Sequence, residues 1–146
     1  MGQRKRRNFE AWQSKNGNSN RHIALYFDMY ESMAFKELSA NEVMLYLRML
    51  SKFTPIYSNN IQISTTSNNI SIPKAEYIKM MSQRTFMQSI DHLIELGFVK
   101  LVKSQFAEKK CNIYGFNDMW QNYGTDKFYI KDEWKRPKFN RGKMLE

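Results

Sequence analysis

Apolar residues follow a helical spacing most regularly between residues 82 and 97. Phe86, Ile90 and Leu93 share one face of a helix at this spacing. Ser82 can accept a hydrogen bond from a backbone N–H group of the first turn, and Gly97 can adopt the left-handed conformation that closes the last turn. The pattern therefore predicts a helix from Ser82 to Gly97 that packs its apolar face into a core.

The residues expected on the opposite face of this helix are polar. It carries Arg84, Gln88, Asp91 and Glu95, with Thr85 and His92 beside them. Side chains of this kind in the first two turns can reach base edges in a DNA groove, so we interpret the segment as the recognition helix of a helix-turn-helix. The candidate DNA contacts are Ser82, Gln83, Arg84, Thr85, Gln88 and His92. For His92, a solvated side chain is an equal alternative.

Two further helices are expected before it. Between residues 22 and 33, apolar residues recur at intervals of three and four positions, and this spacing predicts a first helix there. Ser39 and Glu42 form an S-x-x-E capping box, which predicts a second, central helix that continues to Phe53. The expected core residues are Val43, Leu47, Leu50, Phe86, Ile90, Leu93 and Phe98.

The segment between the central helix and the recognition helix is more varied. Residues 57–69 are polar and rich in Asn, and they predict a long exposed loop. Ile70 and Ile72 predict a short strand that Pro73 ends, and residues 74–81 predict a short helix. Residues 73–97 thus have the two-helix spacing of a helix-turn-helix.

A β-hairpin is expected directly after the recognition helix. Its strands would contain Phe98, Val99, Leu101 and Val102, and then Ile113, Tyr114 and Phe116. The polar bend between them places Lys103, Lys109 and Lys110 where they could contact a DNA backbone. Such a layout is that of a winged helix, and the basic bend would be the wing.

Four segments carry a family resemblance. They are FKELSANEVMLYLRML, ISIPKAEY, SQRTFMQSIDHLIELGFVKLV and NIYGF. Together they resemble the winged-helix proteins of bacterial plasmids, conjugative elements and phages, including replication-initiator-like and transfer-origin accessory proteins. The resemblance covers residues 22–123 and implies an α+β winged helix of three to four helices with a small antiparallel hairpin. It also implies a DNA-binding role in transfer, replication or transcription regulation. The Asn-rich residues 57–69 depart from the family, and no second replication domain is evident, so a full initiator is not expected.

Most of the net charge of +9 belongs to the ends of the chain. Residues 1–21 hold six Lys or Arg against one Glu, residues 124–146 hold seven against four acids, and residues 22–123 hold ten against nine. We therefore expect a basic mobile arm over residues 1–21 and a basic aromatic tail over residues 124–146. The candidate DNA contacts in these tails are Arg4, Lys5, Arg6, Arg7, Lys138 and Arg141. A solvated arm, and a tail pinned to the body by aromatic residues such as Trp134, are the alternatives.

Residues for catalysis or metal binding are scarce. Cys111 is the single cysteine, so no intramolecular disulfide is possible, and with His22 and His92 it offers too few ligands for a structural zinc site. A half-buried structural thiol is the favoured interpretation of Cys111. No clustered nucleophile and base and no phosphate-binding glycine loop is present, so we expect neither enzymatic activity nor a cofactor.

These features predict a non-enzymatic, cytoplasmic protein that binds double-stranded DNA. The helix from Ser82 to Leu96 would read the major groove, while the wing and the tails would contact the backbone or the minor groove. The alternative is a winged-helix interaction module within a DNA-processing complex, with a relaxase or a replication protein as candidate partner. RNA binding is disfavoured because the common RNA-binding signatures are absent. No membrane association is expected, because no stretch approaches 18 apolar residues, and the sequence leaves the oligomeric state open.

Overall fold

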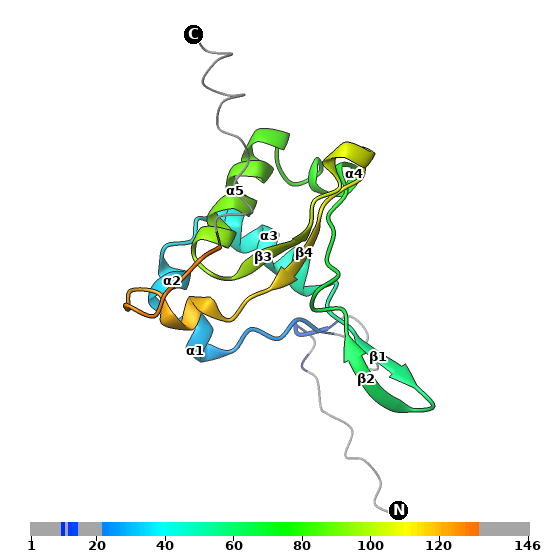
Figure 1. Ribbon diagram of the computed structural model, residues 1–146. Helices are drawn as coiled ribbons and strands as arrows, with labels where there is room; N and C mark the ends of the chain where they lie inside the picture. The colour runs from blue at the N-terminus through cyan, green and yellow to red at the C-terminus, as the bar shows by residue number, and fades with distance from the viewer. Residues whose placement is uncertain (1–9, 11, 15–21, 132–146) are drawn as a thin grey trace, which may run out of the picture.

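The computed structural model describes residues 10, 12–14 and 22–131, and in this part the chain is α+β (Figure 1). The helices are α1 (Phe27–Tyr30), α2 (Met33–Lys36), α3 (Ala40–Leu50), α4 (Lys74–Tyr77) and α5 (Gln83–Glu95). The strands are β1 (Pro55–Ser58), β2 (Ile61–Thr65), β3 (Val99–Lys103) and β4 (Ile113–Phe116), and the 3-10 helices are η1 (Phe106–Glu108) and η2 (Met119–Asn122). The candidate tail contacts Arg4, Lys5, Arg6, Arg7, Lys138 and Arg141 and the expected anchor Trp134 lie outside the described residues.

Helix α5 confirms the prediction made for residues 82–97. Ser82 is its N-cap, and the Ser82 hydroxyl oxygen accepts a hydrogen bond of 3.2 Å from the backbone N–H of Thr85. Gly97 follows the helix with a φ of 86°, a left-handed conformation that favours glycine. A Cβ atom at this position would lie 2.6 Å from the backbone nitrogen of Trp120, so the close approach of η2 also requires glycine.

Helix α3 begins with the expected capping box. The backbone N–H of Glu42 donates to the Ser39 hydroxyl over 3.4 Å, and the backbone N–H of Ser39 donates to Glu42 Oε2 over 3.1 Å. The helix ends at Leu50 rather than at Phe53.

The stripe that α3 buries differs from the expected one. Val43, Leu47 and Leu50 were the expected core residues, and they are only half-buried. The buried apolar residues are Leu45, Tyr46 and Met49. Because α3 is apolar around much of its circumference, spacing alone left its orientation undetermined. Tyr46 contacts Phe98, with ring centroids 5.4 Å apart, so α3 turns the side that carries Tyr46 toward the core.

The single helix predicted for residues 22–33 is wrong. Residues 22–26 are not helical, and two four-residue helices follow. Ser32 separates them because its backbone is extended and its side chain caps α2 by accepting from the N–H of Phe35 over 3.1 Å. Tyr26, Tyr30 and Met33, which the helical pattern had placed on a packed face, are exposed. Within the described residues, this division gives five α-helices where three to four were expected.

The loop predicted for residues 57–69 is also wrong in its first half. Strands β1 and β2 form an antiparallel hairpin with Ser58 opposite Ile61. Asn59 and Asn60 form its turn with φ of 51° and 63°, which Asn tolerates better than most residues. In Figure 1 this hairpin projects from the body at the end away from the start of α5.

The hairpin predicted after α5 is confirmed. Strands β3 and β4 are antiparallel, with Val99 opposite Phe116 and Leu101 opposite Tyr114. The short strand expected at residues 70–72 is reduced to one bridge, in which Ile70 and Tyr114 exchange backbone hydrogen bonds of 2.9 and 2.7 Å. Helix α4 ends at Tyr77 instead of at Met81, so residues 78–82 form the turn into α5.

The core lies between α3, α5 and the β3–β4 hairpin. Phe98 is fully buried at its centre, where its ring stacks on Trp120 with centroids 6.1 Å apart. Tyr77 stacks on Phe86 at 3.9 Å and fixes α4 against α5. Burial raises the pKa of the Tyr46 hydroxyl above its ordinary value. Over the described residues, no helix combines the length and the apolar character that a membrane crossing requires.

Candidate nucleic-acid interface

The first two turns of α5 present polar side chains outward because the opposite face is held in the core. Phe86 and Ile90 are buried, whereas Gln83, Arg84 and Gln88 are exposed. All three are long side chains with hydrogen-bond donors, and no other described element covers them. The structure thus brings together three of the six residues that the sequence suggested for this helix.

Ser82 and Thr85 have a structural function at the start of α5. The Ser82 hydroxyl donates to the Thr85 hydroxyl oxygen over 3.0 Å, in addition to capping the helix. The Thr85 hydroxyl keeps its own hydrogen to donate outward. These two residues therefore order the first turn, and Thr85 retains one group for a ligand.

His92 is held by α3. Its Nδ1 atom is hydrogen-bonded to Oε1 of Glu42, the buried residue of the α3 capping box. The ring orientation is therefore fixed, and Nδ1 is the nitrogen that Glu42 engages. No sequence pattern indicated this link, because Glu42 and His92 are 50 positions apart.

A polar groove lies where α3 begins beside α5. Its volume is about 330 Å³, and it is lined by Ser39, Asn41, Glu42, Thr85, Gln88, Ser89 and His92. One side of the outer face of α5 is therefore flanked by the polar start of α3. Gln88 lies at the border between this groove and the exposed surface.

The bend between β3 and β4 presents the three expected lysines. Lys103, Lys109 and Lys110 are all exposed. The bend is ordered by hydrogen bonds from the backbone N–H of Gln105 to the Asn112 side chain, 3.0 Å, and from the N–H of Lys110 to the Gln105 carbonyl, 3.2 Å. In Figure 1, the bend lies toward the same end of the molecule as α4 and the start of α5.

Cys111 lies in this bend and corrects an expectation. It is exposed, because β4 begins only at Ile113. The interpretation as a half-buried structural thiol is therefore wrong.

Other charged residues modify this surface. Lys74 and Lys79 are exposed on α4 and in the turn before Ser82, and the sequence interpretation missed both. The position of Lys79, three residues before the N-cap of α5, was the available signal. Glu95 is exposed on the last turns of α5, so the favourable part of the helix for a polyanion is its first half.

Two nearby cations are already paired. Arg48 Nε lies 2.5 Å from Glu76 Oε1, and Lys52 Nζ lies 2.7 Å from Glu76 Oε2, which joins α3 to α4. Burial acts to raise the pKa of Glu76, but the hydrogen bonds and charges of Lys52 and Arg48 outweigh it and lower the pKa below its ordinary value.

The first part of the basic tail packs on the body. Phe128 lies edge-on to Tyr123 with ring centroids 5.4 Å apart, and Ile130 packs against the core. Lys127 and Lys131 are exposed beside them. Within residues 124–131, aromatic and aliphatic side chains therefore anchor the tail.

Comparison with known proteins adds no relative: no family model matches the chain, and no match was found among curated proteins or solved structures. Among the described residues, no three His, Cys, Asp or Glu side chains converge in a way that could hold a metal ion. The chemistry of this surface is therefore that of its exposed amide, guanidinium and ammonium groups.

Proposed function

We propose that this chain is a double-stranded DNA-binding protein with a winged-helix architecture. The order of α3, the Ile70 bridge, α4, α5, β3 and β4 supports the proposal, because a helix, a strand, two helices and a two-stranded hairpin follow one another in this way in winged helices. Helix α5 would enter the major groove, and the β3–β4 bend would lie along the adjacent backbone.

The observation that carries the proposal is the outward presentation of Arg84 and Gln88 in the first two turns of an anchored helix. Arg pairs with guanine and Gln with adenine through two hydrogen bonds each, and such a pair discriminates between bases by about 1–3 kcal/mol. Phe86 anchors the helix on its other side, so the backbone that carries these two side chains is held in place.

Sequence-independent contacts complete the proposal. Lys109 and Lys110 in the bend and Lys79 before α5 are exposed cations suited to phosphates. The cationic residues 4–7 and 135–143 would add further phosphate contacts.

The family resemblance narrows the role that we propose. The four resembling segments favour a non-enzymatic protein of a mobile genetic element that acts in transfer, replication or repression. The target would lie in DNA next to its own gene, since such proteins commonly act on their own element.

An interaction module within a DNA-processing complex is the second candidate. Glu95 favours it, because an exposed carboxylate on the proposed recognition helix would repel phosphates. A protein partner would not be subject to this repulsion.

Arg84→Ala and Gln88→Ala test the proposal in a salt-titrated shift assay. Each substitution is expected to lower the ratio of specific to random duplex affinity by about 5- to 150-fold, the equivalent of 1–3 kcal/mol, because one base-reading side chain is removed. Lys36→Ala is the matched control, since Lys36 is an exposed cation on α2. It should leave the ratio unchanged.

The double substitution Lys109→Ala, Lys110→Ala is expected to act differently. It should weaken specific and random binding by the same factor and flatten the salt dependence by about 0.9 for each phosphate that is no longer neutralised. If Arg84→Ala also lowers both affinities equally, α5 clamps the backbone and does not read bases. If none of these variants alters duplex binding, the interaction module becomes the better proposal.

A further inference from the structure

An apolar cleft opens between α1, α3 and the segment from β4 to η2. Its volume is about 670 Å³, and five of its twelve lining side chains are aromatic: Tyr26, Tyr46, Phe53, Phe116 and Trp120. Phe53 lies two residues before β1, so the cleft opens beside the root of the β1–β2 hairpin. Sites for small molecules are typically concave and largely apolar, with volumes of about 300–1,000 Å³. The cleft therefore has the size and the lining of a small-molecule site.

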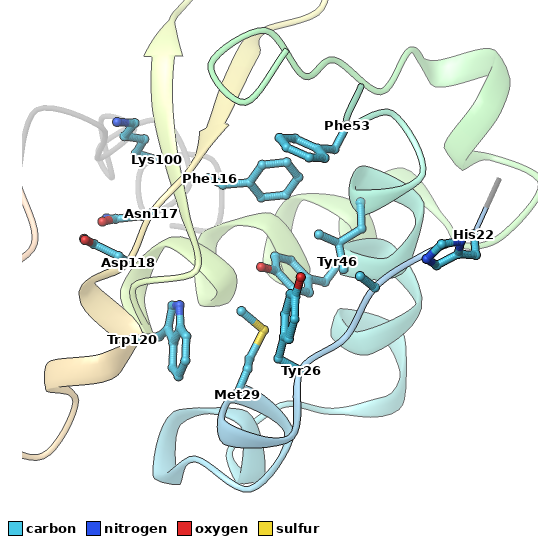
Figure 2. Close-up of a pocket in the computed structure, with 12 residues that line it drawn as sticks. His22, Tyr26, Met29, Tyr46, Phe53, Lys100, Phe116, Asn117, Asp118 and Trp120 are labelled. Atoms are coloured by element: carbon cyan, nitrogen blue, oxygen red, sulfur yellow. The ribbon is translucent and has the colours of Figure 1, made fainter. Parts of the chain in front are cut away.

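Contacts between aromatic rings hold the walls of the cleft in place. Tyr46 lies edge-on to Phe116 with ring centroids 5.9 Å apart, and Phe116 lies edge-on to Phe53 with centroids 6.1 Å apart. Figure 2 shows Phe53 and Phe116 close together at one end of the cleft and Trp120 toward the other. Trp120 stacks on the buried ring of Phe98 with centroids 6.1 Å apart. Because both ends pack on other rings, the cleft is preformed, and a ligand need not order its walls.

The Tyr46 hydroxyl is a buried polar group at this cleft. Tyr46 is 3% exposed, and no group of the described residues forms a hydrogen bond with its hydroxyl. The raised pKa of this hydroxyl is caused by burial, with no contribution from a hydrogen bond. Most buried polar side chains are hydrogen-bonded, because leaving one unsatisfied is unfavourable. The cleft therefore offers a ligand one unused hydrogen-bonding group among apolar walls.

The lining residues also indicate the chemistry of the ligand. Lys100 and Asp118 lie on one side of the cleft, are both exposed and have opposite charges, so the cleft favours neither an anion nor a cation (Figure 2). Aromatic walls favour flat rings, which they contact edge-on or by offset stacking. The Tyr46 hydroxyl can donate a hydrogen bond or accept one, so a hydroxyl or carbonyl oxygen on the ligand would satisfy it.

We propose that this cleft binds a neutral, planar aromatic compound whose single hydroxyl or carbonyl oxygen forms a hydrogen bond with the Tyr46 hydroxyl. The burial of Tyr46 selects a small molecule as the occupant. Because this residue is 3% exposed, only a group that enters the cleft can reach its hydroxyl, and a surface that rests on the rim cannot. The proposal does not rest on DNA binding, and the experiments that test it contain no DNA.

Equilibrium dialysis of the full chain against 1-naphthol and against naphthalene tests the hydrogen bond. The two probes share their rings, and only 1-naphthol has a hydroxyl. The chain is expected to bind 1-naphthol about 2- to 13-fold more tightly than naphthalene, the gain of one hydrogen bond, and Tyr46→Phe should abolish this preference. Tyr57→Phe is the matched control, because it removes the hydroxyl of an exposed tyrosine on β1, and it should keep the preference.

The melting temperature of Tyr46→Phe shows whether the hydroxyl is unused in the free protein. The substitution keeps the ring that contacts Phe98 and Phe116 and removes only a buried hydroxyl without a partner. The variant should therefore melt no lower than the parent chain. A clearly lower melting temperature would mean that the hydroxyl already has a partner within the protein, and the proposal would fail.

NMR spectroscopy of the nitrogen-15-labelled chain locates the bound probe. The indole N–H signal of Trp120, which lines the cleft, is expected to shift when 1-naphthol is added. The signal of Trp12, which is 80% exposed and does not line the cleft, should stay in place. A shift of the Trp12 signal alone, or a preference for 1-naphthol that survives Tyr46→Phe, would overturn the proposal. If neither probe binds, the proposal is wrong, and the cleft is left to a protein partner or to an end of the chain.

Discussion

Leu93 is the residue on which the orientation of α5 can be tested most directly, because none of its surface is exposed. Replacing Leu93 by Ala is expected to lower the free energy of unfolding by about 2–5 kcal/mol, since it removes apolar packing and leaves a cavity. Urea unfolding followed by circular dichroism measures this change. Glu95→Ala, at an exposed position on the same helix, should stay within about 0.5 kcal/mol of the parent chain. An equally small change for Leu93→Ala would mean that α5 faces the other way.

Substitutions at Gly97 and Gly124 allow the energetic cost of backbone strain to be separated from the cost of a steric clash. Both have left-handed φ angles, 86° and 85°, but a Cβ atom at Gly97 would meet the Trp120 backbone at 2.6 Å, whereas at Gly124 it would meet only the end of the Met33 side chain at 3.3 Å. Gly124→Ala is expected to cost about 1–2 kcal/mol from the left-handed conformation alone. Gly97→Ala should cost clearly more, because η2 must also shift. Thermal unfolding of the two variants gives the comparison, and equal destabilisation would contradict it.

Among the elements, α4 is too short to be stable alone and depends on its neighbours. Glu76 joins it to α3 through Lys52 and Arg48, and Tyr77 joins it to α5 by stacking on Phe86. The side chain of Glu76 is 16% exposed, so its two ion pairs are only partly screened by solvent. These interactions position the turn that leads into α5.

The lowered pKa of Glu76 predicts how this junction responds to pH. In the folded chain the carboxylate is favoured, so its contribution to stability is present above the unfolded pKa of 4.5 and disappears as the pH falls through the lower folded pKa. Glu76→Gln is therefore expected to cost about 0.5–1 kcal/mol near pH 7, and the difference from the parent chain should shrink between about pH 5 and pH 3. Urea unfolding of both proteins across this range measures it. A difference that grows on acidification would mean that the pKa of Glu76 is not lowered in the folded chain.

At the scale of the whole molecule, charge is concentrated at the amino terminus. Residues 4–7 are four consecutive cations. Deleting residues 1–8 is expected to leave the melting temperature nearly unchanged, to weaken binding to a long duplex and to flatten its salt dependence by about 0.9 for each phosphate that the arm neutralises. Shift assays over a salt series, with calorimetry, measure the three quantities.

A length-matched control separates length from charge in this experiment. Replacing Arg4, Lys5, Arg6 and Arg7 by Gln keeps the length and should reproduce the effect of the deletion. Unaltered affinity and salt slope in both variants would mean that the cluster is solvated in the complex.

Two exposed surfaces lie toward opposite ends of the molecule (Figure 1). The start of α5 and the β3–β4 bend form one, and the β1–β2 hairpin forms the other. The hairpin can therefore be altered without touching Arg84 or Gln88, so substitutions in it are expected to leave the proposed DNA contacts of α5 intact.

Local interactions allowed part of this structure to be predicted from the sequence. The limits of α5 follow from Ser82, the spacing of its apolar residues and Gly97, all within one segment. The capping box of α3 and the strands β3 and β4 are likewise determined by neighbouring residues. The exposure of Arg84 and Gln88 follows directly, because the buried face of a helix fixes its outer face.

Interactions between distant residues decided the remainder. The orientation of α3 depends on Tyr46 meeting Phe98, and the position of His92 depends on Glu42, and the partners in each pair are 50 or more positions apart. The sequence of residues 22–33 satisfied a helical spacing, yet residues 22–26 are not helical, and the cap at Ser32 divides the helical part that follows. Tyr26 therefore lines an apolar cleft and does not belong to a helix. The spacing of apolar residues shows which of them can share one face of a helix. The residues that pack against the helix determine which face is buried. The tertiary structure alone therefore placed the hairpin beside the cleft and the polar start of α3 beside α5.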